Sequence, residues 1–535
     1  MPDNTQGLAR VWRRAPRWRA DSARQPSRAW HDAAFARMSL PDSSSSDRPT
    51  QLESLFEQWR QRLGLLLGPL ALVLLLLFPV PGVSPEAQRL AAVLALAVIF
   101  WMTEAIPMAA TALLAPALCI PLQVAPDKAV LAPFASPTVF LFIGSFFLAE
   151  AMRKHGLDRR LALWLLTRRG VLRSPFTLYA ALGIMTALLS MWMSNVATTA
   201  VMIPIALGVL ATTPELAARP RAQADIILLI AFSASVGGLG TPVGTPPNLI
   251  AIGFLRQLAG ISISFLDWMK LGVPLVAVLM AFLLWLLRPR GVVFQDRRAL
   301  EAALQLERAA LGPLRPGERN TAFLFALAIA LWLWPGLSQM LAGAPTASGL
   351  WLSQHLPEET VGLLCGLLVF FLPVDLKRWH FTLTWQEAER IDWGTIFLFA
   401  GGLSLGTLIF NTGLAAALGQ NLSAALGQPG LWLLVATGIA LSLALSEATS
   451  NTASANVMIP LMIAVAQASH LPVIPVAMAV SLACSFGFML PVSTAPNALA
   501  YGTGLVPLTR MIRAGLALDL VGAAAIFAAA WLVYR

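Results

Sequence analysis

Apolar stretches long enough to cross a membrane recur from residue 63 to the end of the chain. Apolar residues make up 57% of the 535-residue chain and charged residues only 12%, whereas a soluble globular protein carries roughly 25% charge. The sequence therefore predicts an all-α polytopic membrane protein with about eleven transmembrane helices. We expect the spans near 63–82, 89–105, 107–122, 134–153, 224–258, 271–288, 320–341, 359–373, 393–415, 475–504 and 513–533.

Two further apolar stretches, 174–211 and 431–466, are each about twice as long as a single span. Polar residues interrupt each of them midway: Ser194-Asn195 in the first, and Glu447 through Asn451 in the second. Non-helical backbone at membrane depth is tolerated where it is buried in protein or lines a cavity. We interpret both stretches as re-entrant hairpins.

The distribution of basic residues predicts the orientation. When the polar N-terminal segment 1–62 is placed in the cytoplasm, the basic loops fall on the cytoplasmic side and the C-terminus lies outside. The predicted outside loops 342–358, 416–430 and 467–474 contain no Lys or Arg. The two hairpins then enter from opposite faces, as in inverted-repeat transporters.

An internal repeat supports this arrangement. The segment 194–204 (SNVATTAVMIP) matches 450–460 (SNTASANVMIP), and 242–248 (PVGTPPN) matches 491–497 (PVSTAPN). Upstream, TVFLFIG at 138–144 matches TIFLFAG at 395–401. We expect two structural halves, 63–288 and 320–535, joined by a cytoplasmic linker at 289–319.

The repeated motifs predict binding of small ions. Ser-Asn pairs offer hydroxyl and carboxamide oxygens, which are hard ligands for a small cation, and the Ser can cap the returning leg of its hairpin. The Thr-Pro-Pro-Asn and Thr-Ala-Pro-Asn segments break a span and restart it. Four helix N-termini then converge and nominally supply about two positive charges, which suits a dianion. Neither motif contains Lys, Arg or His, so co-bound sodium would offset the desolvation of the anion. This favours symport, although the dipoles alone could suffice for an exchanger.

Other functional classes fit less well. The formal charge of +10 resides in polar segments, where it orients a membrane protein rather than binding nucleic acid. Cys119, Cys365 and Cys484 lie in apolar runs without zinc-site spacing, and no metalloprotease motif or nucleophile elbow indicates an enzyme. A channel needs a continuous pore, which polar re-entrant tips do not provide. Glu447 either fixes its loop or tunes nearby cations, and the stretch 157–166 is typical of an amphipathic helix on the inner surface.

Three segments carry a resemblance to a known family: the paired Ser-Asn tips, the Gly-Thr-Pro-Pro-Asn at 244–248, and Trp-Met-Thr-Glu-Ala-Ile-Pro at 101–107. Together they resemble the divalent anion/sodium symporter family, which includes sodium-coupled dicarboxylate, citrate and sulfate carriers. The resemblance covers 63–535. It implies a scaffold domain that forms a homodimer in the bacterial inner membrane, and a transport domain with both hairpins that moves as an elevator. The implied function is sodium-coupled symport of a di- or tricarboxylate anion, for which we expect a C4-dicarboxylate such as succinate, malate or fumarate. A sodium-independent dicarboxylate exchanger and a sodium/sulfate symporter are the alternatives.

The resemblance also implies the site residues. Val196 departs from the family pattern by replacing the Thr of the first tip, and Ala495 by replacing the first Pro of the second break. The implied sodium ligands are Ser190, Ser194, Asn195 and Gly244 in the first site, and Ser446, Thr449, Asn451 and Ser493 in the second. The implied substrate ligands are Ser194, Asn195, Thr245, Ser450, Asn451, Thr452 and Thr494.

Overall fold

The computed structural model describes residues 51–78, 83–425, 427 and 430–535, so most of the predicted N-terminal tail lies outside the described residues. Helix α2 (Gln51–Leu77) begins well before the first predicted span. Its membrane-spanning part, Gln58–Leu77, corresponds to that span. The polar residues that we assigned to the tail therefore include the first turns of a helix, because polar residues do not by themselves stop a helix that continues into an apolar segment.

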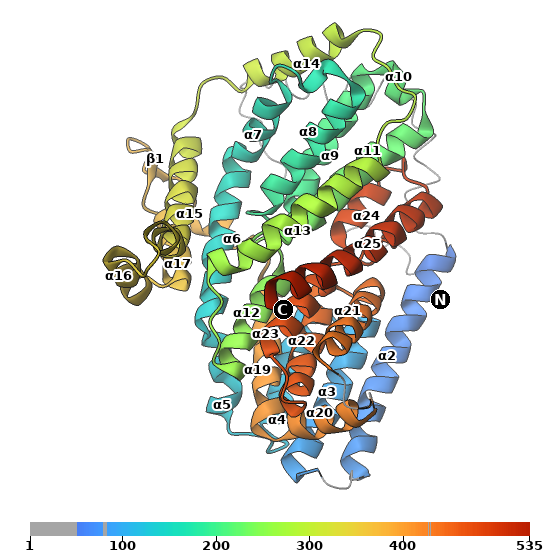
Figure 1. Ribbon diagram of the computed structural model, residues 1–535, viewed down its shortest axis with the longest axis vertical. Coiled ribbons are helices and arrows are strands. Elements are labelled where there is room, and N and C mark those ends of the chain that lie inside the picture. Colours follow the sequence, from blue (N-terminus) through green and yellow to red (C-terminus); the bar gives the residue numbers. More distant parts are fainter. Residues whose placement is uncertain (1–50, 79–82, 426, 428–429) are drawn as a thin grey trace, which may run out of the picture.

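All the regular elements in the described part of the first half are helices (Figure 1). After α2 come α3 (Pro85–Thr103), α4 (Met108–Cys119), α5 (Asp127–Leu131), η2 (Ala132–Ala135), α6 (Pro137–His155), α7 (Leu157–Leu166) and η3 (Val171–Arg173). These are followed by α8 (Pro175–Ser190), α9 (Asn195–Thr212), α10 (Pro214–Ala217), α11 (Pro220–Gly238), α12 (Pro246–Ala259) and α13 (Phe265–Leu286).

The predicted linker contains one helix, α14 (Arg297–Ala310), and leads to the second half. That half comprises α15 (Pro316–Ala342), α16 (Ala347–His355), α17 (Glu358–Leu368), β1 (Pro373–Asp375), β2 (His380–Phe381), α18 (Trp385–Ala388), α19 (Trp393–Asn411) and α20 (Leu414–Ala425). It ends with α21 (Leu431–Ala448), α22 (Asn451–Ala468), α23 (Val473–Cys484), α24 (Ala495–Tyr501) and α25 (Leu508–Tyr534).

Each of the eleven predicted spans contains a helix or a pair of helices. Among the described residues, nine helices are long and apolar enough to cross a membrane, including one leg of each hairpin, α9 and α21. The predicted spans 224–258 and 475–504 are each two helices, α11–α12 and α23–α24, separated by a non-helical break. The predicted outside loops 342–358 and 416–430 hold α16 and part of α20, and a short antiparallel strand pair, β1–β2, was not expected.

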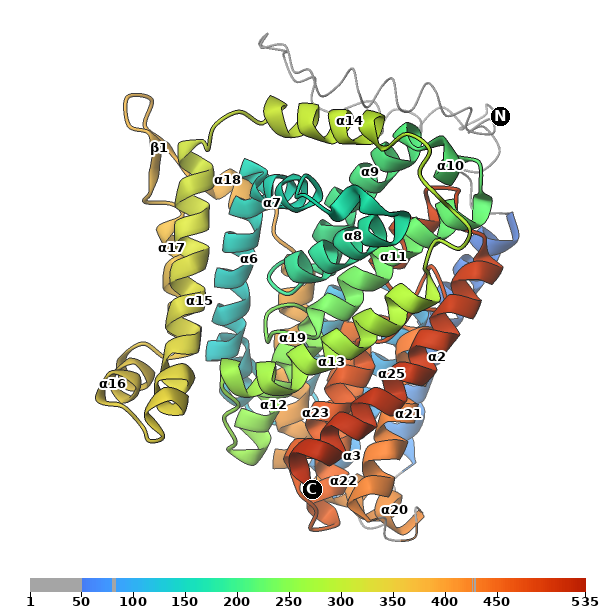
Figure 2. The ribbon, with the colours of Figure 1, turned by 45° about the horizontal axis from the view of Figure 1, so that its top comes forward.

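The inverted repeat is visible in the order of the elements. From α6 onward, the series α6, α7, α8–α9, α11–α12, α13 corresponds to α19, α20, α21–α22, α23–α24, α25. Gly156 and Gly413 occupy matching positions before α7 and α20, with φ of 68° and 80°, a conformation that glycine adopts without steric cost. The first hairpin, α8–α9, lies toward the end of the molecule that carries α14, and the second hairpin, α21–α22, lies toward the opposite end (Figure 2).

The two halves are interlocked by crossed helix pairs. Helix α17 packs on α6 and α4 packs on α19. Gly144 lies against the backbone of Gly362 and Gly366, and the corresponding Gly401 lies against Ala112. Small residues at these crossings allow close backbone approach, as is common in membrane helix pairs.

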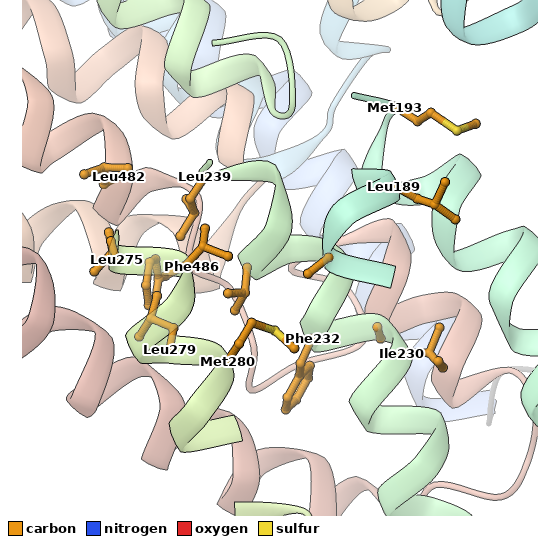
Figure 3. Close-up of a cluster of buried hydrophobic side chains, with 14 of the residues drawn as sticks. Leu189, Met193, Ile230, Phe232, Leu239, Leu275, Leu279, Met280, Leu482 and Phe486 are labelled. Carbon is orange, nitrogen blue, oxygen red and sulfur yellow. The ribbon is translucent and has the colours of Figure 1, made fainter. Parts of the chain in front are cut away.

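The hairpins share a hydrophobic core with the helices that follow them. Figure 3 shows buried side chains of the first hairpin beside residues of α11, α13 and the end of α23. Phe232 on α11 also packs edge-to-face on Phe488, which follows α23, with ring centroids 5.1 Å apart. The core therefore joins the first hairpin to the second half. Its labelled members are Leu189, Met193, Ile230, Phe232, Leu239, Leu275, Leu279, Met280, Leu482 and Phe486.

Candidate cation and anion sites at the hairpin tips

The first hairpin turns between Ser190, at the end of α8, and Asn195, at the start of α9. Ser194 is the N-cap of α9, and its hydroxyl accepts a hydrogen bond from the backbone N–H of Ala197 at 3.2 Å. The hydroxyl of Ser190 lies 2.8 Å from the carboxamide of Asn195. The turn is therefore held by the polar residues that interrupt the apolar pattern.

The first helix break lies beside this tip. Helix α11 ends at Gly238, and α12 begins after its N-cap, Thr245. The amide nitrogen of Asn248 donates to the carbonyls of Gly238 at 2.9 Å and Thr241 at 2.8 Å, and so fixes the break. A Cβ at Gly238 would lie 2.6 Å from Asn195 Oδ1, so the absence of a side chain at Gly238 lets the tip lie close to the break.

Oxygen atoms converge where the tip meets the break. The atom of the Asn195 carboxamide that faces Ser190 also lies 3.2 Å from the carbonyl oxygen of Ala234 and 3.3 Å from that of Gly244. The surrounding acceptors favour the orientation in which the amide nitrogen faces inward and donates to these oxygens. With Oδ1 facing inward instead, the four oxygens would form a group that suits a cation. Helices α8 and α11 both end here, and the negative partial charge of helix C-termini favours a cation.

The second hairpin repeats this geometry. Ser446 Oγ donates to Asn451 Oδ1 at 2.8 Å, and Ser450 caps α22 by accepting from Ala453 N at 3.2 Å. Asn497 donates to the carbonyls of Gly487 at 2.8 Å and Leu490 at 3.0 Å, just as Asn248 does in the first half. A Cβ at Gly487 would lie 3.3 Å from Asn451 Oδ1. Both halves therefore bring a Ser-Asn pair against a glycine of the following break.

Glu447 distinguishes the second half from the first. Its side chain is buried, and Oε1 accepts hydrogen bonds from the backbone N–H groups of Phe488 at 2.6 Å and Met489 at 2.9 Å. Its Oε2 lies 2.9 Å from the hydroxyl of Ser493. Of the two roles considered for Glu447, the contacts favour fixing the loop, because the carboxylate binds the break directly.

The two tips differ in their surroundings. In the second tip, Thr449 Oγ donates to the carbonyl of Trp101 at 3.0 Å, and Ser450 Oγ lies 3.2 Å from the sulfur of Met108. These contacts dock the second tip on the α3–α4 segment, at the end of α3 and the start of α4. In the first tip, Ser194 is exposed and the Val196 side chain is 43% exposed. The two hairpins are therefore not equivalent in this conformation.

The structure brings most of the predicted residues to these two places. Ser190, Asn195 and Gly244 belong to the first oxygen group, and Thr245 is buried beside it as the N-cap of α12. In the second half, Ser446 and Asn451 are in contact, Thr494 caps α24 and Thr452 is buried, whereas the hydroxyl of Thr449 points away toward Trp101. Three cavities of about 250, 450 and 500 Å³ lie elsewhere, and none of the three is lined by a predicted site residue.

The two places are linked across the repeat. Helix α12 packs on α22 and α23, and α24 packs on α9 and α11. Ser481 on α23 donates to the carbonyl of Pro247 at the start of α12, at 2.8 Å. The helix that follows the break in each half, α12 or α24, therefore lies against the returning hairpin leg of the other half, α22 or α9.

Sequence reasoning assigned no role to three residues of these sites. Asn248 and Asn497 stand at matching positions of the repeated motif, and that match was the available signal. Ala234 contributes only its carbonyl oxygen. No side-chain pattern could have indicated it, because every residue carries a carbonyl.

Comparisons with known proteins agree with this architecture. Residues 59–534 match the family described as the sodium:sulfate symporter transmembrane region. A sodium-dependent dicarboxylate transporter, SdcS, of Staphylococcus saprophyticus is 33% identical, with 86% of this chain and 89% of that protein covered. An uncharacterized transporter of Haemophilus influenzae is 32% identical, with 82% and 90% covered.

Two solved structures share the fold. The YdaH transporter of Alcanivorax borkumensis has a TM-score of 0.53 at 14% identity, with 76% of this chain and 88% of that chain covered. MtrF of Neisseria gonorrhoeae has a TM-score of 0.50 at 12% identity, with 75% and 82% covered. At such identities the likeness concerns the fold alone. The extensive sequence match and the repeated hairpin architecture together establish that this chain belongs to the divalent anion/sodium symporter family.

Proposed function

We propose that the protein is a sodium-coupled symporter of a C4-dicarboxylate such as succinate, malate or fumarate in the bacterial inner membrane. The observation that carries the proposal is the oxygen group at the first hairpin, where Asn195, Ser190, Ala234 and Gly244 converge. Hydroxyl, carboxamide and carbonyl oxygens are ligands for hard cations. The sodium dependence and dicarboxylate specificity in the name of the Staphylococcus relative support the same function.

The anion would bind between the tips, held without cationic side chains. Helices α9, α12 and α22 begin at the two sites, and each N-terminus contributes about half a positive charge. The short helix α24 contributes less, because aligned peptide dipoles add up over successive turns. Their N-caps Ser194, Thr245 and Ser450, together with Thr494 of α24, supply hydroxyl groups. Two carboxylates could therefore be stabilised by dipoles and hydroxyls, with sodium balancing the remaining charge.

The difference between the two tips supports transport by an elevator movement. The second tip is docked on the α3–α4 segment through Thr449, whereas the first tip exposes Ser194. We propose that α8–α13 and α21–α25 move together as the transport domain, since α12 packs on α22 and α23 and α24 packs on α9 and α11, and that the crossed pairs α6–α17 and α4–α19 belong to the scaffold. The scaffold would form a homodimer, with the N-terminus in the cytoplasm and the C-terminus outside.

Uptake of labelled succinate into proteoliposomes tests this proposal. The vesicles are either empty or preloaded with unlabelled dicarboxylate, under an inward sodium gradient or equal potassium. We expect uptake into empty vesicles, and we expect this uptake to require sodium. Unlabelled malate should inhibit the uptake more strongly than unlabelled sulfate does. Uptake that needs internal dicarboxylate and ignores sodium would instead establish an exchanger. Stronger competition by sulfate would make sulfate the substrate.

A further inference from the structure

A basic pocket lies between the α7–α8 connection and α14. Figure 2 shows α7 and α14 side by side at one end of the molecule. The pocket has a volume of about 500 Å³. Four arginines line it, three from the connection and one from α14, together with a single carboxylate, that of Glu301. The arginines are Arg168, Arg169, Arg173 and Arg297.

These four guanidinium groups have no acidic partner. All four side chains are exposed, and none forms an ion pair with a carboxylate among the described residues. Arginines close by behave differently: Arg159 pairs with Glu307 at 3.0 Å, and Arg160 pairs with Glu318 at 2.8 Å. The four positively charged guanidinium groups of the pocket repel one another, and a bound anion would reduce that repulsion.

Guanidinium groups favour phosphate as the anion. The planar fork of N–H donors matches two oxygens of a phosphate group, and arginine is therefore the common residue of phosphate sites. The pocket is also large enough for a group bigger than a simple ion. Its location is outside the predicted cation and anion sites, since it contains none of their residues.

Apolar side chains beside the arginines indicate that the phosphate belongs to a lipid. Leu161 and Trp164 lie on α7 just before Arg168, and these two apolar side chains are 36% and 43% exposed. The Arg168 guanidinium stacks 4.0 Å from the centroid of the Trp164 ring. Phe176, 47% exposed, follows Arg173 by three residues at the start of α8. Such a border of exposed apolar rings and guanidiniums suits the boundary between acyl chains and headgroups.

We propose that this pocket binds the phosphate headgroup of an anionic phospholipid. The orientation proposed above places the pocket at the cytoplasmic leaflet, where basic pockets of membrane proteins bind anionic headgroups. The exposed rings of Trp164 and Phe176 contact the acyl chains, and the arginines contact the phosphate. The lipid would bridge α14 to the connection that leads into the first hairpin.

Native mass spectrometry of the purified full chain in detergent tests the proposal. Phosphatidylglycerol and phosphatidylcholine with identical acyl chains are the two probes. The test variant combines Arg168→Gln, Arg169→Gln and Arg173→Gln. The matched control combines Arg319→Gln, Arg378→Gln and Arg390→Gln, which remove three exposed arginines outside the pocket. Lipid-free melting temperatures establish that both variants are folded.

We expect the test variant to bind phosphatidylglycerol on the order of 100-fold more weakly, because each arginine contributes about fivefold. The control should bind like the native chain, and phosphatidylcholine should bind weakly to all three proteins. Unchanged phosphatidylglycerol binding by the test variant, or equal binding of the two lipids by the native chain, would overturn the proposal.

A second measurement adds inorganic phosphate to the lipid-bound and the lipid-free protein. If the phosphate displaces the lipid, or raises the melting temperature of the native chain but not of the test variant, the pocket is a site for free phosphate instead. The measurement does not depend on transport, so its failure is distinguishable from failure of the proposed symport.

Discussion

Replacing Asn195 with alanine removes one of the four oxygens proposed to surround the first sodium ion. The remaining ligands are Ser190 Oγ and the carbonyl oxygens of Ala234 and Gly244. A contact between a polar group and a charge is worth about 1.5–3 kcal/mol, and about 1.4 kcal/mol corresponds to tenfold in affinity. We therefore expect the half-saturating sodium concentration of Asn195→Ala to rise about 10- to 150-fold, with little uptake left at ordinary sodium concentrations.

The assay is succinate uptake by proteoliposomes as a function of external sodium. Thr199→Val is the matched control, because the Thr199 hydroxyl bonds the backbone carbonyl of Asn195 within the same helix, at 2.7 Å, and takes no part in the oxygen group. Valine keeps the side-chain volume at this buried position. We expect the control to retain the native sodium dependence.

The alternative orientation of the Asn195 amide makes a different prediction. If the amide nitrogen faces inward and donates to Ser190, Ala234 and Gly244, alanine removes structural hydrogen bonds rather than a cation ligand. The melting temperature would then fall while the half-saturating sodium concentration of the residual uptake stayed unchanged. That outcome would refute the cation site at the first hairpin.

Three further changes test other parts of the structure. Glu447→Ala leaves the N–H groups of Phe488 and Met489 without their acceptor, which costs about 1–3 kcal/mol for each group. Its melting temperature should therefore fall well below that of Glu447→Gln, which keeps an acceptor oxygen. Equal melting temperatures of the two variants would contradict the role of Glu447 in fixing the loop. Val196→Thr restores a hydroxyl at the exposed first tip and should change the competition ranking of succinate, malate, citrate and sulfate; an unchanged ranking would show that this position does not face the anion. On α7, burial raises the pKa of Asp158 from 3.8 to about 6. The folded protein binds this proton more tightly than the unfolded chain does. The free energy of unfolding should therefore fall by up to about 3 kcal/mol as the pH rises from about 4 to 6. Asp158→Asn should remove this decline when melting temperatures are measured over a pH series. If the variant and the native chain have the same pH profile, Asp158 is not the cause of the decline.

Local sequence determined the helix boundaries at the two sites. Ser194 and Ser450 were predicted to cap the returning hairpin legs, and both do so. A cap joins residues only three positions apart, so the short motif contains all the atoms that form it. The repeat likewise predicted matching hairpins and breaks in the two halves, and the structure confirms them, because equal local sequences favour equal local conformations.

The sequence also predicted the span pattern, since apolar stretches of sufficient length form helices in a membrane. Three helical stretches were not predicted. They are the polar start of α2 in the predicted tail, and α16 and part of α20 in two predicted outside loops. Short or polar helices give little hydropathy signal, and their presence depends on packing against neighbours rather than on composition.

Only the tertiary structure decided which distant groups meet. The oxygens of Ala234 and Gly244 join Asn195, and Glu447 binds backbone N–H groups some forty residues further along the chain. The hydroxyl of Thr449, a residue that the family resemblance implies as a sodium ligand, donates to the carbonyl of Trp101 in the other half. These contacts use backbone atoms that every residue carries, and the pairing of segments far apart is set by helix packing. The sequence therefore determined which residues could bind ions, and the fold determined which of them face the same point.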